Sequence, residues 1–390
     1  MRLLLFLLLL LLQTWAAVRV LARLVATARG PRIGSAAPGA VAARRVSVLV
    51  PVLDEESRLP RCLAGLVRAG PEVAEIVVVD GGSVDGTVGV VQGYARRDPR
   101  VRLVHAGLIP ADWNGKARGL QIGLERSDPA TRWLLTIDAD VAVEPALARS
   151  LVAHAEGAGV RALSAATLQV VSGPAEGLVH PALLATLVYR FGIPGGASTD
   201  PRAVQANGQC FLVRRDVLQG VGGFAVARQS LCEDVTLARA LAVAGVAVGF
   251  YETAGLARTT MYGDARQALA GWSRSLPMRD EYSGAAGWLG LLEITLAQAL
   301  PLPVLVATRL ARGDGLLRRL NGILLLVRLG VLWGTARAYP ERPWTYWLSP
   351  LFDLPVVLLV LASALRRRHT WRGRTYQVRG GRLRLVAAVG

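Results

Sequence analysis

Two aspartates separated by one residue form the acidic turn Asp138-Ala139-Asp140. They follow the apolar run 133–137, whose length and composition predict a buried strand. In an α/β sheet, ligands bind beyond the carboxyl ends of the strands. Carboxylate oxygens are ligands that Mg²⁺ prefers, and the ion is commonly shared with substrate phosphates. The turn therefore predicts a site for a divalent metal and a diphosphate, although a plain surface turn can carry the same two aspartates.

Two more predicted strands end in carboxylates. Residues 75–79 are rich in β-branched side chains and lead into the glycine-containing acidic turn 80–87, and residues 46–52 lead into the acidic segment 53–56. Segments of helical character separate the strands. A single turn of this kind is most simply explained as a helix cap, whereas three at one edge of a sheet predict a binding site.

The chain has 45 basic residues, and Lys116 is its only lysine. It stands in the glycine turn 113–117, just ahead of the predicted helix 117–125. A compact ammonium suits a phosphate oxygen at a turn where the planar guanidinium of arginine does not fit. Survival of one lysine by chance would leave the same pattern, so Lys116 supports the phosphate site without establishing it.

Six segments in sequence order carry a family resemblance: "PVLDEE", "VVVDGGSVDGT", "WNGKARGLQIGL", "LLTIDADVAVEP", "NGQCFLVRRDVLQGVGGF" and "CEDVTLARAL". Over residues 46–282 the chain resembles family 2 glycosyltransferases with the GT-A fold, an α/β fold with a mainly parallel sheet flanked by helices. It is most similar to membrane-bound bacterial enzymes that glycosylate carotenoids, hopanoids or sphingoid lipids. The resemblance implies a nucleotide-sugar donor, taken as UDP-glucose, a Mg²⁺ or Mn²⁺ ion, and inversion at the anomeric carbon.

The matching motif positions imply a role for each residue. Asp140 is implied to be the principal metal ligand, Asp138 to face both metal and nucleotide, and Asp234 of the pair Glu233-Asp234 to be the general base. The other residues implied to bind the nucleotide sugar are Pro51, Asp54, Glu55, Asp80, Asp85, Lys116, Ala139, Gln209, Trp272 and Arg274. Residues 232–244 also have a helical pattern, and acids in a first turn complement the helix dipole, which is the alternative explanation of the pair.

One segment departs from the pattern of processive polysaccharide synthases. Those enzymes carry (Gln/Arg)-x-x-Arg-Trp after the acidic pair, whereas residues 268–272 read Ala-Leu-Ala-Gly-Trp and are followed by Ser273 and Arg274. Only the tryptophan is kept. The departure predicts transfer of a single sugar, and it leaves the roles of Trp272 and Arg274 open.

The first 28 residues predict a membrane anchor. Residues 3–12 are unbroken apolar sequence, and the apolar character extends to residue 18, near the lower length limit for a spanning helix. A cleaved signal peptide is the alternative. Nucleotide sugars are cytosolic, however, and secretion would separate the enzyme from its donor. Residues 29–45, rich in Arg, Pro, Gly and Ala, predict a basic linker.

Residues 283–370 predict membrane segments. Residues 288–311 contain Glu293 and two prolines, which predicts a broken, re-entrant or interfacial segment. Residues 320–336 and 344–365 predict two spanning helices. Together with the N-terminal anchor, these spans predict a multi-pass protein of the inner (plasma) membrane.

Basic residues predict which side of the membrane the chain faces. The run 366–369 and the basic tail 371–390 predict a cytosolic C-terminus, and arginines after the anchor place the catalytic domain in the cytosol too. The net charge of +17 fits an anionic lipid surface better than nucleic acid, because the sequence has no nucleic-acid-binding module. The predicted partners are the donor, a membrane lipid acceptor and the bilayer.

The predicted acceptor is a hydroxyl of a membrane lipid such as a carotenoid or hopanoid. The runner-up is a polyprenyl phosphate, but a phosphate acceptor needs no strong base, so Asp234 favours an alcohol. A polysaccharide synthase and a nucleotidyltransferase are weaker alternatives. A nucleotidyltransferase would carry a basic glycine-rich loop after the first strand, where residues 53–56 read Leu-Asp-Glu-Glu.

Overall fold

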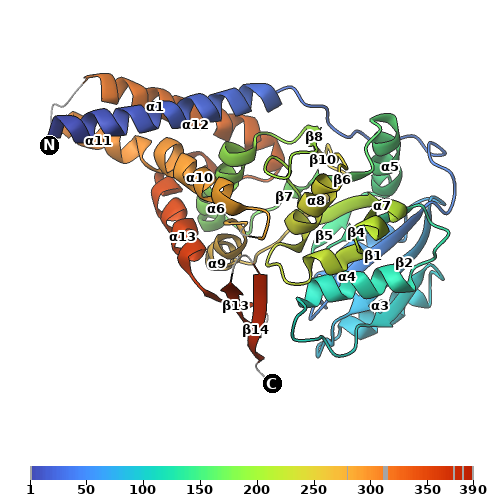
Figure 1. Ribbon diagram of the computed structural model, residues 1–390. Coiled ribbons are helices and arrows are strands. Elements are labelled where there is room, and N and C mark those ends of the chain that lie inside the picture. The colour runs from blue at the N-terminus through green and yellow to red at the C-terminus, as the bar shows by residue number, and fades with distance from the viewer. Residues whose placement is uncertain (1, 279, 311–314, 372–373, 380–381, 389–390) are drawn as a thin grey trace.

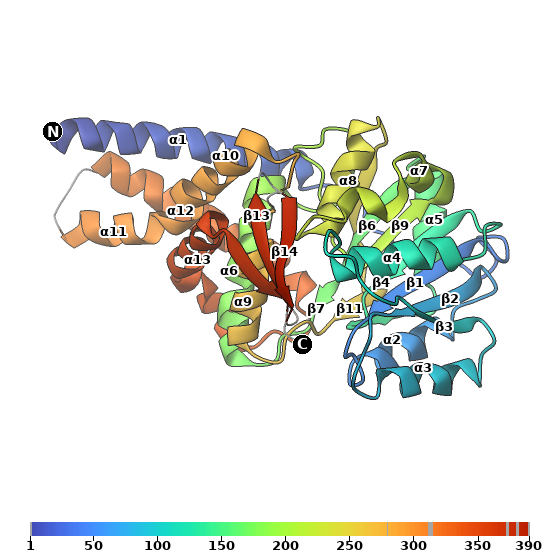
Figure 2. The same cartoon turned by 60° about the horizontal axis from the view of Figure 1, so that its bottom comes forward.

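The computed structural model describes residues 2–278, 280–310, 315–371, 374–379 and 382–388. An α/β domain lies at one end of the molecule and a group of helices, which includes the N-terminal helix, lies at the other (Figures 1 and 2). A small C-terminal sheet lies between the two regions, in front of α6 and α9 in Figure 2.

The main sheet has eight strands in the order β3-β2-β1-β4-β9-β6-β10-β8. Its strands are β1 (Val46–Val52), β2 (Val73–Asp80), β3 (Val101–His105), β4 (Trp133–Ile137), β6 (Ala162–Ala166), β8 (Gly196–Ser198), β9 (Cys210–Arg214) and β10 (Val248–Glu252). Strands β3, β2, β1 and β4 are parallel, whereas β9 runs antiparallel to both β4 and β6. Strand β10 is parallel to β6 and antiparallel to β8. The sheet is therefore mixed: β9 and β8 oppose the other six strands, so most of its strands are parallel as predicted, and the half with the acidic turns is fully parallel.

Both faces of this sheet are covered by helices because successive side chains of a strand point to opposite faces. In β1, Val48 and Val50 pack into the core formed with α2, α3 and α5, whereas Leu49 packs into the core formed with α4, α7 and α8. These helices are α2 (Leu59–Leu66), α3 (Thr87–Ala95), α4 (Gly115–Arg126), α5 (Leu147–Gly157), α7 (Arg215–Gly220) and α8 (Glu233–Val243), with the 3₁₀ turn η1 (Gly223–Ala227) beside them. The parallel half is thus buried on both sides, and its strand ends are left open for a ligand.

Two small sheets lie near these strand ends. Strands β5 (Val141–Val143), β11 (Ala257–Thr259) and β7 (Leu168–Gln169) form the first, which begins directly after Asp140. Strands β12 (Arg368–Trp371), β13 (Arg374–Arg379) and β14 (Arg382–Ala388) form the second, at the C-terminal end. Within the predicted basic tail, residues 372, 373, 380, 381, 389 and 390 lie outside the described residues.

A separate hydrophobic core holds the helical region together. The helical region comprises α1 (Arg2–Thr27), α6 (Pro174–Phe191), α9 (Ala265–Ser275), α10 (Gly284–Ile294), the π-helical turn η2 (Thr295–Ala299), α11 (Pro301–Leu310), α12 (Gly315–Thr335), the 3₁₀ turns η3 (Ala336–Ala338) and η4 (Trp344–Phe352), and α13 (Asp353–Leu365). Buried Gln13 of α1 and Asn321 of α12 exchange two amide hydrogen bonds of 2.9 Å. A reciprocal amide pair of this kind fixes the register of α1 against α12.

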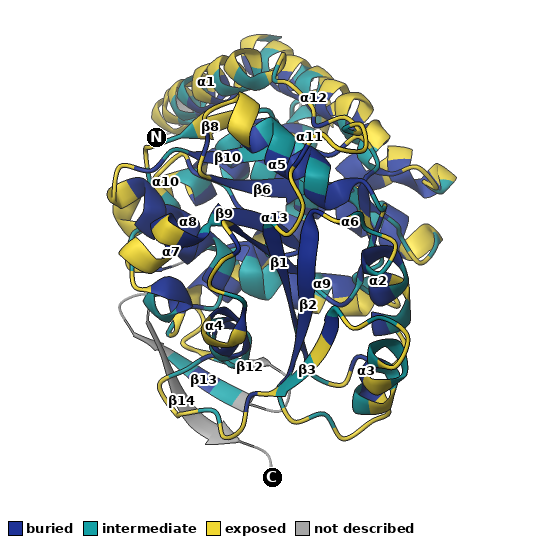
Figure 3. Ribbon diagram, turned by 90° about the vertical axis from the view of Figure 1, so that its right-hand side faces the viewer, coloured by how far each residue is buried: buried dark blue, intermediate teal, exposed yellow. Residues whose placement is uncertain are grey.

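Two described helical segments have the length and composition to cross a membrane, Leu4–Thr27 and Trp344–Leu365. A bent pair, Gly284–Ala299 and Pro301–Leu310, would add a third if it acted as one span. The 44° bend precedes Pro301, in keeping with the predicted broken segment. The outward surface of α1 is largely exposed (Figure 3), and the exposed side chains include Leu4, Leu8 and Leu11.

The span predicted over residues 320–336 is not among these candidates. It belongs to α12, which also carries Arg318, Arg319 and Arg328. Arg328 is buried and donates from Nε to Asp353 Oδ2 at 2.7 Å and from Nη2 to Asp353 Oδ1 at 3.0 Å. A buried arginine needs such a paired carboxylate, so this face of α12 packs on α13 and does not face lipid.

Candidate functional site

A pocket lies where the acidic turns after β1, β2 and β4 meet, and it has about 850 Å³ of empty space including its open mouth. We call it the acidic pocket. It is lined by Pro51, Val52, Leu53, Glu55, Val79, Gly81, Ile109, Gly115, Lys116, Gly119, Asp138, Ala139, Asp140 and Tyr376. The predicted residues among these come from the ends of β1 and β4 and from the start of α4, whereas the end of β2 contributes Val79 and Gly81, which were not predicted. The expected convergence at one sheet edge is thus present in the fold.

Lys116 joins two parts of the site. Its Nζ lies 2.7 Å from Asp138 Oδ1, after β4, and 2.9 Å from Glu233 Oε1, at the start of α8. The helix that carries it begins at Asn114, whose side chain accepts a 3.0 Å hydrogen bond from Ala117 N. Burial opposes the ammonium, but Asp138, Glu233 and a third carboxylate raise the pKa of Lys116 above its usual value. The lysine therefore remains charged inside the pocket.

Asp234 lies in the first turn of α8, beside this lysine. Its Oδ2 accepts a hydrogen bond from the backbone N–H of Gly208. Burial, followed by the neighbouring charge of Glu233, raises the pKa of Asp234 to about 7. A carboxylate with a raised pKa is a stronger base than an exposed one.

Gly208 is a site residue that the sequence reading did not single out. A Cβ at this position would lie 2.8 Å from Lys116 Nζ and 3.3 Å from Asp234 Oδ2. A side chain at this position would displace the Lys116 ammonium or the Asp234 carboxylate, so glycine leaves both in place. The segment "NGQ" carried the available signal, but from it only Gln209 entered the predicted set.

Asp140 lies close to two other carboxylates of the pocket, Asp138 and Glu55. Burial, then the charges of Asp138 and Glu55, raise its pKa to about 7. Its Oδ1 is buried and has no hydrogen-bond partner among the described residues. Within that part of the chain, no group of three His, Cys, Asp or Glu side chains is placed to hold a metal ion. A cation at Asp138 and Asp140 would therefore need further ligands from a substrate or from water.

The other predicted aspartates shape the loops around the pocket. Asp80 accepts from Gly82 N at 3.2 Å and from Ser83 N at 3.1 Å, and Asp54 accepts from Val84 N at 2.9 Å. None of the predicted aspartates 54, 80 and 85 is among the described residues that line the acidic pocket. The hydrogen bonds of Asp54 and Asp80 stabilise the turn that places Gly81 in the wall of the acidic pocket.

Asp85 belongs to the same loop and acts as a cap. Its Oδ1 accepts from Thr87 N at 3.0 Å, at the start of α3, and its Oδ2 accepts from Glu56 N at 3.1 Å. The hydrogen bond with the Thr87 side chain lowers the pKa of Asp85. Asp85 thus bonds to the first residue of α3 from the position before the N-cap residue, which is Gly86.

Gln209 lies directly behind the acidic turn. Its carbonyl accepts a 3.1 Å hydrogen bond from Asp138 N, and its side-chain Oε1 accepts from Asn207 Nδ2 at 2.8 Å and from the Thr167 hydroxyl. Its own Nε2 is buried without a hydrogen-bond partner among the described atoms. Gln209 therefore positions Asp138 through the backbone and retains one donor for a ligand.

Trp272 and Arg274 lie on α9, away from the lining of the acidic pocket. The Trp272 ring packs edge-on against His180 of α6, with ring centroids 4.6 Å apart, and its Nε1 donates to Met261 Sδ at 3.2 Å. Trp272 thus contributes to the packing between α9 and α6.

Tyr376 of β13 completes the acidic pocket from the C-terminal sheet. It is almost fully buried, with 2% of its surface exposed. The sequence left this contact undecided, because the basic aromatic segment 371–376 fits either a membrane-surface anchor or a part of the active site. The contact arises because the chain returns to the sheet edge after α13.

A second, apolar cavity adjoins the ends of β6 and β10 and has about 1280 Å³ of empty space. We call it the apolar cavity, and its walls include Leu24, Val25, Leu168, Leu184, Val188, Val327 and Val331. Thr167 lies in its wall and donates its hydroxyl hydrogen to Gln209 Oε1. At its rim Glu252 pairs with Arg32 at 2.7 Å and with Arg337 at 3.0 Å. The cavity therefore reaches from α1 and α12 to the back of the acidic turn.

Sequence comparisons match a known family over the part of the chain that holds Lys116 and the acidic turns. Residues 47–222 match the family model described as Glycosyl transferase family 2. The chain is 37% identical over 103 residues to the lipopolysaccharide core biosynthesis glycosyltransferase LpsC of Rhizobium meliloti (strain 1021), which covers 26% of this chain and 34% of that protein. It is 34% identical over 88 residues to the uncharacterized glycosyltransferase EpsJ of Bacillus subtilis (strain 168), which covers 21% of this chain and 26% of that protein. The chain spans between about a quarter and a third of the length of these two relatives.

A solved structure extends the comparison to the fold. The mannosyltransferase PcManGT from Pyrobaculum calidifontis, solved in complex with GDP-Man and Mn²⁺, has a TM-score of 0.53 and 17% identity, covering 92% of this chain and 99% of that one. At this identity the likeness concerns the fold alone. The predicted family resemblance is confirmed for the matched region: residues 47–222 form a glycosyltransferase family 2 domain in an α/β GT-A fold with a mixed sheet.

Proposed function

We propose that this chain is a membrane-attached enzyme that moves one sugar from a nucleotide-sugar donor, with UDP-glucose as the proposed donor, to a hydroxyl of a membrane lipid. The observation that carries the proposal is the position of Lys116, whose ammonium bridges Asp138 and Glu233. This bridge brings the part of the site suited to a diphosphate next to Asp234, the residue suited to deprotonate an acceptor.

The proposed cofactor is Mg²⁺ or Mn²⁺, held by Asp140 and Asp138 together with oxygens of the donor diphosphate. The buried, unpaired Oδ1 of Asp140 supports this role, because a buried carboxylate oxygen without a partner is costly. When bound, the ion would neutralise negative charge that accumulates on the leaving diphosphate. The Mn²⁺ and GDP-Man in the P. calidifontis mannosyltransferase are consistent with this assignment.

The chemical step requires a base and a displaced leaving group. As the acceptor oxygen forms a bond to the anomeric carbon, the bond from that carbon to the diphosphate oxygen breaks, and Asp234 accepts the hydroxyl proton. The Gly208 N–H holds Asp234 Oδ2 in place. Lys116 remains next to the departing diphosphate and offsets its charge. Direct displacement inverts the anomeric carbon and needs no covalent sugar intermediate.

The apolar cavity supports a lipid as the acceptor. It is bounded by α1, α6 and α12 on the membrane-attached side, and Thr167 links its wall to Gln209 behind the acidic turn. A hydrocarbon chain in this cavity would be shielded from water while its polar end pointed toward the strand ends. A carotenoid or hopanoid alcohol has this combination of a long apolar body and one hydroxyl.

The packing of α1 supports a retained anchor over a cleaved leader. Buried Gln13 is paired with Asn321, and Arg23 of α1 donates to Glu293 Oε2 at 2.9 Å. Removal of α1 would leave both the buried amide and the buried carboxylate without these partners, at a cost of about 1–3 kcal/mol for each group. We therefore treat α1 as part of the folded enzyme.

Two contacts bear on the route of the chain through the membrane. Arg337, which follows α12, pairs with Glu252 at the end of β10. Tyr376, which follows α13, lines the acidic pocket. Both ends of the segment Trp344–Leu365 therefore lie on the side of the catalytic domain. We propose that this segment enters and leaves the bilayer on one side, while α1 and the hairpin of α11 and α12 extend away from the catalytic domain (Figures 1 and 2).

Expression in a host that makes hydroxylated carotenoids tests the proposed acceptor. Mass spectrometry of the extracted lipids should show a gain of one hexose on a lipid with the wild-type chain and no gain with the Asp234→Asn variant. A ladder of hexoses or a soluble polymer would contradict the proposal of a single transfer. A hexose found only on a polyprenyl phosphate would replace the alcohol with the runner-up acceptor.

Replacement of Tyr376 tests the contribution of the C-terminal sheet to donor binding. Because this buried side chain lines the acidic pocket, we expect Tyr376→Ala to raise the KM for the donor about tenfold, equivalent to about 1.4 kcal/mol. Tyr376→Phe separates the ring from the hydroxyl: a KM near that of the wild type would assign the effect to the ring. An unchanged KM in the alanine variant would mean that the donor does not reach this wall of the pocket.

A further inference from the structure

A third cavity lies where α1 meets α6, α8 and α10, and it has about 1360 Å³ of empty space. We call it the arginine cavity, because its described lining includes the arginines Arg19, Arg23, Arg190, Arg202 and Arg239. The carboxylates in this lining are Asp200 and Glu293. None of the described lining residues is shared with the acidic pocket. Positive charge thus exceeds negative charge in a cavity that has no part in the sugar-transfer chemistry.

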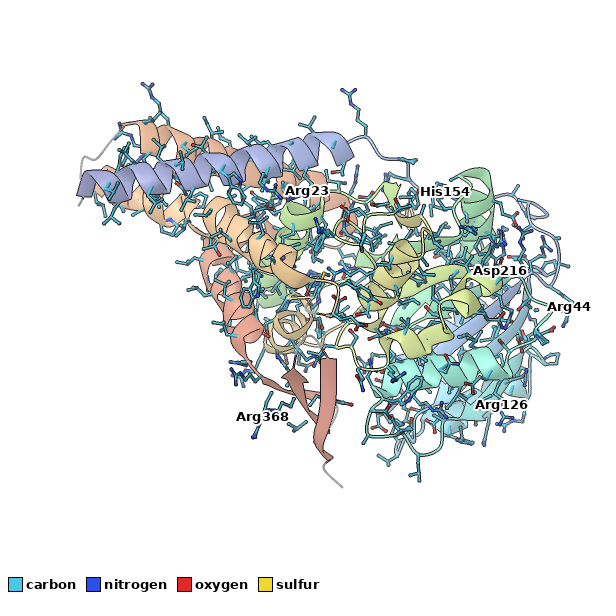
Figure 4. All side chains as sticks on the ribbon, viewed as in Figure 1. Arg23, Arg44, Arg126, His154, Asp216 and Arg368 are labelled. Atoms are coloured by element: carbon cyan, nitrogen blue, oxygen red, sulfur yellow. The ribbon has the colours of Figure 1, made fainter. Side chains whose placement is uncertain are left out.

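Arg19 and Arg23 share a single carboxylate. Both donate to Glu293, whose side chain is only 2% exposed; Arg23 Nη1 lies 2.9 Å from Glu293 Oε2. The two guanidinium groups face the cavity from α1, and Arg23 lies beneath that helix on the side of the catalytic domain (Figure 4). One carboxylate cannot neutralise both cations, so a positive charge remains at this wall.

Arg190 and Arg239 are buried arginines in the wall of the cavity. Arg190, 7% exposed, bonds only to carbonyl oxygens in the described structure: Nε to Thr186 O at 3.0 Å and Nη2 to Leu276 O at 2.6 Å. Arg239 pairs with Asp280 at 2.8 Å, but its Nε is buried and has no described hydrogen-bond partner. Burial and the charge of Arg239 lower the pKa of Arg190 to about 9. Both observations point to a place for an anion.

We propose that the arginine cavity binds a phosphate group. Guanidinium groups bind phosphate oxygens with paired, charge-assisted hydrogen bonds, and several arginines around one buried space favour an anion with several oxygens. The cavity lies beside the last turns of α1, where the apolar sequence that could enter a bilayer ends. Phospholipid phosphates lie at this depth, so the two sources of the group are an anionic lipid headgroup and free phosphate.

The position of Arg239 connects the cavity to the active site. Arg239 lies five residues after Asp234 on α8, about 7.5 Å along the helix axis at 1.5 Å per residue. A phosphate bound at Arg239 would therefore hold the helix whose first turn carries the proposed base. Occupancy of the cavity is expected to raise kcat while donor affinity stays the same, because donor and phosphate contact different residues.

Native mass spectrometry of the full-length chain in detergent tests the proposal. The probes are phosphatidylglycerol and diacylglycerol with the same acyl chains, and inorganic phosphate is titrated by calorimetry in parallel. We expect phosphatidylglycerol to be retained about tenfold better than diacylglycerol, the ratio produced by about 1.4 kcal/mol. If the protein retains phosphatidylglycerol but does not bind inorganic phosphate, the ligand is a lipid headgroup. If it also binds inorganic phosphate, the cavity accepts phosphate both from a headgroup and from solution.

Three variants locate the binding. Arg202→Gln changes an exposed wall residue, and Arg190→Gln changes a buried one. The control Arg126→Gln changes an exposed arginine at the end of α4, far from α1 (Figure 4). We expect each cavity variant, but not the control, to lose several-fold in phospholipid retention and to keep the donor Kd. If Arg190→Gln fails to fold, Arg202→Gln still decides the matter, since retention equal to the wild type in that variant would overturn the proposal. Equal retention of the two lipids by the wild type would overturn it as well.

Discussion

Replacing Asp140 by Asn is expected to lower the rate of sugar transfer at least about a hundredfold, the scale seen when a group that stabilises transition-state charge is removed. The substitution keeps the shape of the side chain and removes its charge. It acts on a buried carboxylate whose Oδ1 has no described hydrogen-bond partner and which lies next to Asp138 and Glu55. Loss of a cation ligand, not loss of packing, is therefore the expected cause.

Thermal unfolding supplies a measurement that does not depend on activity. In the absence of metal, Asp140→Asn should be at least as stable as the wild type, because it removes one of several neighbouring negative charges from a buried site. Added Mn²⁺ should raise the Tm of the wild type but not that of the variant. EDTA should abolish transfer, and Mg²⁺ or Mn²⁺ should restore it.

The control for Asp140 is Asp216→Asn, which makes the same chemical change on α7. Asp216 is exposed and paired with Arg214, and Figure 4 shows it on the α/β domain, away from the C-terminal sheet that borders the acidic pocket. It should keep the wild-type rate and the Mn²⁺-dependent rise in Tm. Full activity of Asp140→Asn, or of EDTA-treated wild type, would defeat the metal-dependent reading.

Replacing Asp234 by Asn should abolish transfer with little effect on donor binding. A positioned general base contributes about a hundredfold to ten-thousandfold to rate, so kcat should fall by an amount in that range. The Asn carbonyl oxygen can still accept the hydrogen bond from Gly208 N–H, which keeps the start of α8 in place. Donor affinity measured by calorimetry should therefore stay within a few-fold of the wild type.

Glu233→Gln is the informative comparison for Asp234. Glu233 lies 2.9 Å from Lys116, so its loss should alter the lysine and weaken donor binding. The two adjacent substitutions are thus expected to change different constants. Asp234→Asn should change kcat, and Glu233→Gln should change the donor Kd. Wild-type turnover by Asp234→Asn would eliminate it as the base and would favour an acceptor, such as a phosphate, that is already ionised.

Local sequence patterns predicted the part of the fold that holds the donor side of the site. The strands over 46–52 and 133–137 have the predicted bounds, because runs of buried apolar residues end at charged turns. The helix after Lys116 begins at Gly115, two residues earlier than predicted, because Asn114 caps it. These features depend on neighbouring residues, which is why a single sequence reveals them.

Local sequence patterns did not predict the contacts between segments that are distant in the chain. The pair Glu233-Asp234 could be placed beside Lys116 only through the family resemblance, and neither Gly208 nor Tyr376 was in the predicted set. Their roles depend on backbone approach and on the return of the chain after α13, which leave no periodic signal. For the same reason α12 was read as a span, since its leucines are visible in the sequence but the pairing of Arg328 with Asp353 is not.

The contact of Tyr376 with the acidic pocket also has a consequence for biosynthesis. The walls formed by residues 51–140 leave the ribosome before the helices α6 to α13, whereas the wall formed by β13 leaves it after them. This wall of the pocket can form only after the helices that precede β13 have been made and packed. Catalytic competence would then depend on completion of the helical region, and chains truncated before β13 would lack this wall of the pocket.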